Sequence, residues 1–337
     1  MAESTEGRRL VSIVYPVLNE LPNVDRLLER MSQVVEKHPT YEFEFVVVDD
    51  GSTDGTTDAL RSRLPENVTL RIITFSRNFG SHSAITAGIH AAGGESVILM
   101  GADIQEPLST ITAFLEAWSD GNEVVWGVRS SRAAGGFTGT LASKAFSMLF
   151  HRYTDLPNYP AEGPSCVLCD RRVLNTLRPM DERHRNLYGL IAWVGYRQTT
   201  VEFEQQPRRG GKSKWTTRKL VKLAFDSLVQ FSHAPIRASS YLGVVMATSG
   251  FIYALFLVIR AFFDRRGPEG FTTLLVAILL IGGVQLVMLG TLGEYVWRGV
   301  DETRRRPLYV IDRERSDEAL VSRIEQSRST DSARLGR

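Results

Sequence analysis

Several short groups of carboxylate, amide and arginine side chains in the first third of the chain each follow directly after a run of apolar residues. They occupy positions 16–20 (PVLNE), 49–52 (DDGS), 76–78 (SRN) and 101–105 (GADIQ). Paired carboxylates such as Asp49 and Asp50, placed where a strand ends, suit hydrogen bonds to a base and a ribose, or binding of a metal ion. The alternative is an ordinary turn, because Asp and Gly favour turns in any context.

Asp103 and Gln105 supply a carboxylate and an amide oxygen two residues apart. Hard cations such as Mg²⁺ and Mn²⁺ prefer oxygen ligands, and with few protein carboxylates they commonly keep diphosphate oxygens as well. The pair is therefore a candidate metal site. The competing interpretation is that Asp103 caps the helix expected near Pro107.

Residues 208–215 (RRGGKSKW) combine cations with glycines. Glycine lets the backbone approach a phosphate closely, while Arg and Lys contribute charge and hydrogen-bond donors. This pattern favours a phosphate-binding loop. A solvated basic loop attracted to anionic lipid would have the same composition.

Cys166 and Cys169 have the C-x-x-C spacing of redox and zinc sites. No second pair completes a zinc site. The segment is typical of a strand, which points the two thiols to opposite faces. We therefore expect both cysteines to pack in the core.

The elements that must position these groups alternate between short strands and helical patterns. Strands are predicted at 10–15, 43–48, 70–75, 96–100 and 123–128, and helices between them include 83–92 and 109–118. An apolar stripe of Leu27, Met31, Val34 and Val35 predicts one further helix. This alternation predicts an α/β fold with a mostly parallel sheet, in which functional residues lie at the carboxyl ends of the strands.

Two long apolar runs near the C-terminus, 241–263 and 271–297, contain only Arg260 and Glu294 as charged residues. Such runs can cross a bilayer core of about 30 Å, whereas helices of a soluble core seldom lack a polar face over this length. The short link 264–270 predicts a transmembrane hairpin. Arginines are more numerous on its terminal side, and the first ten residues lack an apolar signal region. We therefore expect an inner-membrane protein with both termini and the catalytic domain in the cytoplasm.

Residues 215–236, before the first run, carry apolar side chains at helical spacing beside Arg218, Lys219 and Lys222. A basic amphipathic helix suits the membrane surface. A surface helix packed on the soluble domain is the alternative. After Ile311 the tail is polar and charged, and we expect it to be mobile.

The order of these motifs resembles that of the bacterial polyprenyl-phosphate glycosyltransferases, family 2 glycosyltransferases related to dolichyl-phosphate mannose synthase, with a GT-A fold. The resemblance covers residues 11–312. The matching stretches are 14–20 (VYPVLNE), 48–55 (VDDGSTDG), 76–80 (SRNFG), 102–107 (ADIQEP), Arg208 with 211–215 (GKSKW), and 292–295 (LGEY) with Arg306 and Pro307.

The resemblance implies transfer of a sugar from a UDP- or GDP-linked donor to polyprenyl phosphate by a homo-oligomer, a tetramer. Asp103 and Gln105 would hold Mg²⁺ or Mn²⁺ on the donor diphosphate, and Asp103, Asp170 and Arg208 would be catalytic. The implied nucleotide-sugar-binding residues are Pro16, Asn19, Glu20, Asp49, Asp50 and Arg77. The implied acceptor phosphate-binding residues are Arg129, Arg208, Ser213 and Lys214.

The expected organisation of the chain follows from these assignments. A polar N-terminus (1–9) precedes the GT-A domain (10–214) and the interface helix (215–236). A transmembrane pair (237–298) and a cytoplasmic C-terminal tail (299–337) complete the chain.

Two positions depart from the family pattern. Gly101 stands where the D-A-D-L-Q motif has its first Asp, and Ser165 stands where G-D-F-x-L-x-D-R has its first Asp. The loss of a carboxylate suits a phosphate acceptor, which is already anionic at neutral pH, better than a sugar hydroxyl, which needs a general base. We expect a single in-line displacement that inverts the anomeric carbon and relies on positioning and on stabilising the leaving diphosphate.

The composition of the 337 residues narrows the alternatives. A formal net charge of +2 gives no support to a general nucleic-acid binder, and two cysteines cannot form a disulfide scaffold. A processive polysaccharide synthase would need a wider membrane channel and a Q-x-x-R-W motif, and 205–209 (QQPRR) lacks the Trp. A catalytically inactive membrane scaffold is the remaining alternative, given Gly101 and Ser165.

Overall fold

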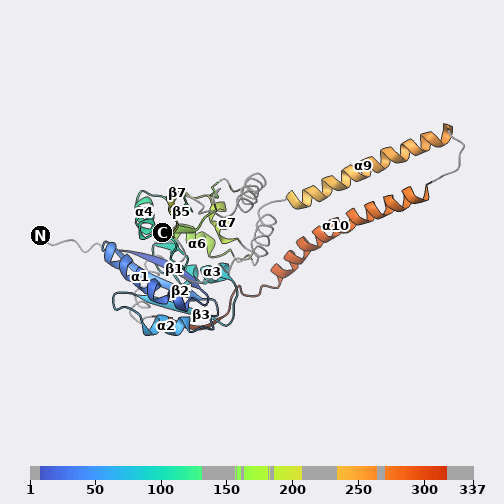
Figure 1. Cartoon of the computed structure of the whole chain (residues 1–337). Helices are drawn as coiled ribbons and strands as arrows, with labels where there is room; N and C mark the ends of the chain where they lie inside the picture. The colour runs from blue at the N-terminus through green and yellow to red at the C-terminus, as the bar shows by residue number, and fades with distance from the viewer. Residues whose placement is uncertain are drawn as a thin grey trace, which may run out of the picture.

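The computed structural model describes residues 8–130, 156, 158–160, 163–180, 182, 186–206, 234–263 and 270–316. The N-terminal part supplies seven strands of an eight-stranded sheet covered by helices, and residues 311–316 supply the eighth. Two long helices extend away from this sheet (Figure 1). Nearly all of the predicted interface helix, 215–236, lies outside the described residues.

The sheet has the strand order β7-β5-β6-β4-β1-β2-β3-β8. Its strands are β1 (Arg9–Val17), β2 (Tyr41–Asp49), β3 (Leu70–Phe75), β4 (Ser96–Leu99), β5 (Val124–Arg129), β6 (Cys166–Asp170), β7 (Gln198–Phe203) and β8 (Ile311–Ser316). The central strands β4, β1, β2 and β3 are parallel, as are β5 and β7, whereas β6 and β8 run antiparallel to their neighbours. These strands confirm the predicted α/β class and the five predicted strands.

Helices cover both faces of the sheet and bury two hydrophobic clusters. One face carries α1 (Val24–Lys37), α2 (Thr56–Ser62) and α4 (Leu108–Ser119), and the short η1 (Leu21–Asn23) leads into α1; the other carries α3 (Ser81–Ala91), α6 (Arg171–Leu177) and α7 (Leu187–Trp193). Because both faces are covered, the central strands are apolar along nearly their whole length. Cys166 and Cys169 lie fully buried in opposite clusters, and burial raises the pKa of both thiols, which confirms their packing role.

Residues 311–316 correct the expectation of a mobile tail, because they form β8 against β3. Ser76 N donates to Val310 O at 3.0 Å, and the rings of Phe75 and Tyr309 stack with centroids 5.0 Å apart. Without β8, β3 would present a row of unpaired backbone groups. Charged side chains are common on such outer strands, so polar composition here reflects an edge strand rather than disorder.

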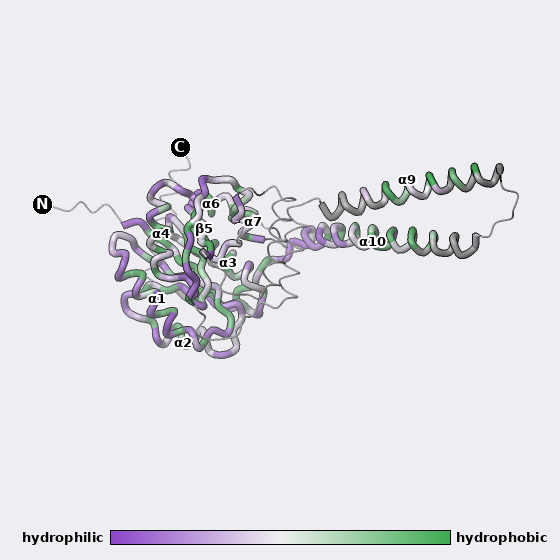
Figure 2. The backbone as a smooth tube through the Cα atoms, turned by 45° about the horizontal axis from the view of Figure 1, so that its top comes forward, coloured by the Kyte–Doolittle hydropathy of each residue, from purple (hydrophilic) through white to green (hydrophobic). Residues whose placement is uncertain are grey.

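Two long helices, α9 (Ala234–Phe263) and α10 (Phe271–Thr303), pack side by side outside the sheet (Figures 1 and 2). Large apolar side chains on them are exposed, including Tyr241, Phe251 and Leu286 at about 70% each. Among the described residues, Leu280–Thr303 is long and apolar enough to cross a bilayer, while the apolar stretch Gly243–Tyr253 is shorter. The first predicted span, 241–263, and with it the hairpin, is therefore not confirmed and stays a prediction.

Candidate active site

Hydrogen bonds tie the loops after β1 and β2 together at the carboxyl edge of the sheet. Asn19 N donates to Ser52 Oγ (2.8 Å), and Thr53 N donates to Asn19 Oδ1 (2.9 Å). Glu20 N donates to Thr56 Oγ1 (3.0 Å). Asn19 adopts a left-handed backbone with φ +50°, a conformation that Asn tolerates better than most residues. Two predicted nucleotide-binding residues thus fix the relative position of the two loops.

The carboxylates of Asp49 and Asp50 are buried and engaged within the protein. Asp49 accepts hydrogen bonds from Ser52 N (2.8 Å) and from Thr57 Oγ1. Asp50 accepts from Phe79 N (2.6 Å) and Gly80 N (2.9 Å) in the loop after β3. Burial raises the pKa of Asp50, although these N–H groups oppose the shift. Both carboxylates therefore hold the loops that follow β2 and β3 in place.

Gly51 lets the β2–α2 turn approach the loop after β3. Its φ is +81°, and a Cβ at this position would lie 2.7 Å from the Arg77 carbonyl carbon. Arg77 itself is exposed, with its guanidinium 4.0 Å from the Phe79 ring centroid. Pro16, half-buried and paired in register with Val48, lies at the same edge. The predicted nucleotide residues that the structure describes are therefore brought together.

The loop after β4 presents the predicted metal ligands. The residues that follow β7 hold Gln105 in place. Gln205 Nε2 donates to Gln105 Oε1 and Gln206 N donates to Gln105 O, both at 2.8 Å. Asp103 is half-buried, and a Cβ on Gly101 would lie 2.9 Å from Asp103 Oδ1. The departure at Gly101 thus leaves room for the Asp103 carboxylate. Because Pro107 occupies the N-cap of α4, Asp103 does not cap this helix.

Glu106 is a site residue that the sequence reasoning missed. It is 7% exposed, and burial together with the Asp103 carboxylate raises its pKa to about 7, while Arg129 and Arg30 oppose the shift. A cavity of about 10 Å³ beside it has room for one water molecule. The cavity is lined by Tyr15, Arg30, Met100, Gly101, Ile104, Glu106 and Ile111. The 102–107 motif contains this residue, but only the fold reveals that it is buried beneath Asp103.

Arg129 and Ser165 complete the described part of this edge. Arg129 Nε donates to Ser165 Oγ at 2.9 Å, so Ser165, which replaces the family's Asp, orients a predicted phosphate-binding arginine. The other predicted phosphate-binding residues, Arg208, Ser213 and Lys214, lie outside the described residues.

Asp170 lies at the opposite edge of the sheet, where it pairs in register with Ser96, the first residue of β4. It accepts hydrogen bonds from Trp118 Nε1 (2.8 Å) and from Arg172 N (2.9 Å), the second of which caps α6. The structure therefore separates Asp170 from the other predicted site residues and gives it a capping role. The antiparallel direction of β6 carries it away from the other predicted residues.

The residues at this edge fit a divalent metal that is bound largely through its substrate. Within the described ranges, no group of three or more His, Cys, Asp or Glu side chains could hold an ion alone. One carboxylate and one amide oxygen, from Asp103 and Gln105, are the small protein contribution that Mg²⁺ accepts when phosphate oxygens complete its shell.

Comparison with known proteins shows which family this chain belongs to. Residues 12–178 match the family described as Glycosyl transferase family 2. An uncharacterized glycosyltransferase of Synechocystis is 37% identical over 89% of this chain and 94% of its own. A prophage bactoprenol glucosyl transferase homolog of Escherichia coli is 31% identical over 90% of this chain and 98% of its own. The mannosyltransferase of Pyrobaculum calidifontis, solved with GDP-Man and Mn²⁺, matches 86% of this chain and 89% of its own at 19% identity and a TM-score of 0.44, which supports no residue assignment.

These two relatives are above 30% identity, and each is matched over more than nine-tenths of its own length. The chain therefore belongs to glycosyltransferase family 2 and has its GT-A fold.

Proposed function

We propose that this protein transfers a hexose from a nucleotide sugar to the phosphate of polyprenyl phosphate at the cytoplasmic face of a membrane. The observation that carries the proposal is that Asp103 and Gln105 follow β4, which pairs in parallel with β1, whose loop is tied to that of β2. The same chain also contains the apolar α10. Relatives named bactoprenol glucosyl transferase support this acceptor and a hexosyl donor.

The nucleotide would lie across the β1, β2 and β3 loops, with the sugar directed toward Asp103. A divalent cation held by Asp103 and Gln105 would neutralise charge on the departing nucleoside diphosphate. Arg129, oriented by Ser165, offers a guanidinium to the acceptor phosphate or the leaving diphosphate. Arg208, Ser213 and Lys214 remain predicted partners of the same phosphate.

The acceptor phosphate is anionic at neutral pH and needs no general base. A direct attack on the anomeric carbon then forms the new glycosidic bond as the bond to the diphosphate breaks, which inverts the configuration. The absence of a carboxylate at Ser165 agrees with this route. Catalysis would depend on alignment and on stabilising the leaving group.

Membrane attachment would place the acceptor within reach of this site. The exposed apolar side chains of α9 and α10 suit lipid contact, and the arginines that follow α10 suit the cytoplasmic surface. We extend the proposal to a two-span hairpin and a homotetramer, since Gly282, Gly283, Gly290 and Gly293 allow close approach of helices.

The test is incubation of the purified full chain with polyprenyl phosphate, Mg²⁺ or Mn²⁺ and a panel of UDP- and GDP-linked sugars. Mass spectrometry of the lipid should detect one added hexose, and NMR of the product should find the anomeric configuration inverted. Absence of any sugar-modified lipid across the panel would contradict the proposal, and a retained configuration would contradict the mechanism.

A further inference from the structure

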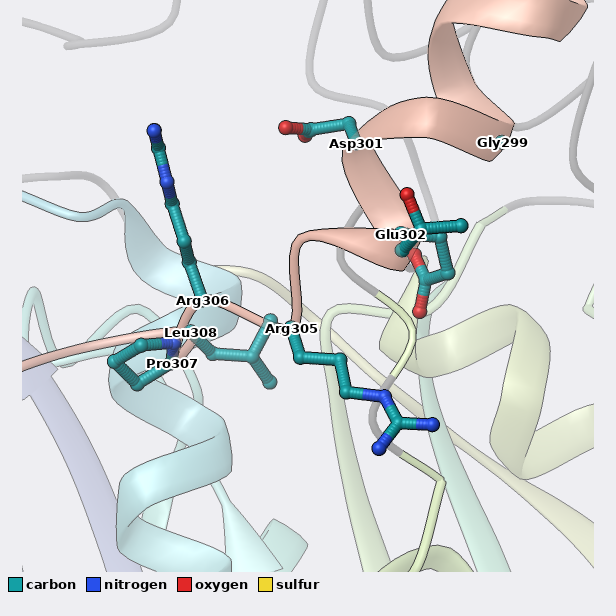
Figure 3. A pocket seen from close by; sticks show the side chains of 8 residues that line it. Gly299, Asp301, Glu302, Arg305, Arg306, Pro307 and Leu308 are labelled. Carbon is teal, nitrogen blue, oxygen red and sulfur yellow. The ribbon is translucent and has the colours of Figure 1, made fainter.

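A pocket of about 680 Å³ lies where α10 ends and the chain turns toward β8 (Figure 3). Its volume is in the range of pockets that hold small molecules. The residues that line it, among those described, are Gly299, Asp301, Glu302, Thr303, Arg305, Arg306, Pro307 and Leu308. The proposed mechanism uses none of them.

Arg305 and Arg306 bring two exposed guanidinium groups to this pocket, which the carboxylates of Asp301 and Glu302 also line. Both are exposed, and within the part of the chain that the structure describes neither guanidinium forms an ion pair or a hydrogen bond. Figure 3 shows their side chains extending to different sides of the link. Arg304, by contrast, lies 3.9 Å from Asp301 and 5.1 Å from the Trp297 ring centroid, so it compensates the charge of Asp301.

The link that contains these arginines joins the apolar helix to the nucleotide side of the sheet. On one side it continues the apolar segment Leu280–Thr303. On the other side, Tyr309 stacks on Phe75, and Val310 O accepts from Ser76 N, the first residue of the loop that Asp50 holds. A ligand with an apolar tail along α10 and an anionic head in this pocket would therefore have its head near the β3 loop.

We propose that this pocket binds the phosphate of the polyprenyl phosphate acceptor through Arg305 and Arg306. The inference rests on the proposed function and adds a binding site to it. Each guanidinium offers a planar fork that can bind two phosphate oxygens, so the phosphate can be held on either side of the link before it moves to the reacting position.

The experiment compares the wild-type full chain with the double variant Arg305→Gln/Arg306→Gln and with Arg313→Gln, a charge-matched control on β8. Binding of a short-chain prenyl phosphate in detergent is measured by calorimetry, with the corresponding prenol, phosphatidylglycerol and the nucleoside diphosphate as separate probes. We expect the double variant to bind prenyl phosphate about 10- to 100-fold more weakly, since charge-assisted hydrogen bonds are at stake. The Arg313→Gln variant should bind prenyl phosphate with wild-type affinity. The nucleotide affinity should be the same in all three proteins.

Three outcomes would overturn the proposal: unchanged prenyl phosphate affinity, a loss confined to the nucleoside diphosphate, or an equal loss for phosphatidylglycerol. Because both side chains are exposed, the melting temperature of the double variant should match the wild type. If it does not, Arg305→Lys/Arg306→Lys serves as the second variant. It should retain partial affinity, and full wild-type affinity would overturn the bidentate geometry. A wild type that binds prenyl phosphate but transfers no sugar would contradict the proposed function and leave the binding site supported.

Discussion

At the carboxyl edge of the sheet, Asp103 lies half-buried in a loop beside Gly101, whereas at the opposite edge Glu44 is fully buried and Asp170 caps a helix. Gly93 N donates to both carboxylate oxygens of Glu44 at 3.2 Å, and Trp118 Nε1 donates to Asp170. Carboxylates thus form structural hydrogen bonds at one edge of the sheet, whereas at the other edge a carboxylate lies half-buried in a loop.

The difference teaches that strand direction and local partners decide what a carboxylate does. Even at the carboxyl edge, Asp49 and Asp50 are engaged by backbone N–H groups and shape loops. Asp103 lies instead in a loop held through its neighbour Gln105. Substitution of individual carboxylates at the two edges tests this division.

Asp103→Ala should have the largest effect. Removing the carboxylate that would hold the metal on the diphosphate should lower sugar transfer by about 10³-fold, the upper range for a group that stabilises transition-state charge. The measurement is the transfer rate in Mg²⁺ and in Mn²⁺, with metal-dependent donor binding as a second observable. Wild-type rates in both metals would remove Asp103 from the site.

Asp50→Asn should have a smaller effect, limited to the donor. The amide retains the shape but weakens the charge-assisted hydrogen bonds from Phe79 N and Gly80 N, so the loop after β3 is held less firmly. We expect about a tenfold rise in the KM for the nucleotide sugar. An unchanged KM, with melting temperature also unchanged, would show that these hydrogen bonds do not position the loop.

Asp170→Ala should change stability and leave transfer intact. Loss of the α6 N-cap should lower the free energy of unfolding by about 1 kcal/mol, and the Trp118 hydrogen bond adds to that loss. Denaturant unfolding and the transfer rate are measured on the same preparation. A large drop in rate at a temperature where the variant is folded would restore Asp170 to the catalytic residues and break the comparison.

Glu44→Gln should give the smallest effect, visible as a change in pH dependence. Burial raises the pKa of Glu44 above its ordinary value, while Arg71, Gly93 N and Arg171 oppose the shift. At pH values between the ordinary pKa of the unfolded state and the raised pKa of the folded state, the folded state binds more protons than the unfolded state. The free energy of unfolding therefore falls as pH rises through this window. The Gln variant should lack that slope when melting temperatures are compared from pH 4.5 upward. An identical slope in both proteins would assign it to other groups.

The sequence predicted the elements better than the roles of individual side chains. The structure confirms the five strands predicted at 10–15, 43–48, 70–75, 96–100 and 123–128. They were predictable because strands buried on both faces consist of nearly continuous apolar runs. Asp170 was misplaced because the direction of β6 depends on long-range pairing with β4 and β5, which no local pattern encodes. Glu106 was missed for a similar reason, since its burial comes from Tyr15 and Arg30 on other elements.

The same limit explains β8. A charged segment such as 311–316 has no apolar alternation, so its strand state is decided by the unpaired edge of β3 rather than by its own composition. Conversely, the grouping of Asn19, Asp50 and Asp103 was predictable, because parallel strands bring their carboxyl ends to one edge whatever the intervening helices contain.

The position of β8 also determines how the sheet is suspended from the helix pair. The chain leaves the sheet at β7, one outer strand, and returns at β8, the other outer strand, across eight strands that span about 34 Å at a spacing of about 4.8 Å. A domain attached at one point can rotate in any direction. A domain attached at both outer strands can still rotate about the axis that joins the two attachments, but it resists tilting of that axis. The sheet is thus connected to the helix pair through both of its outer strands. Lengthening one attachment should tip the carboxyl edge of the sheet relative to α9 and α10, and lengthening both equally should only raise it.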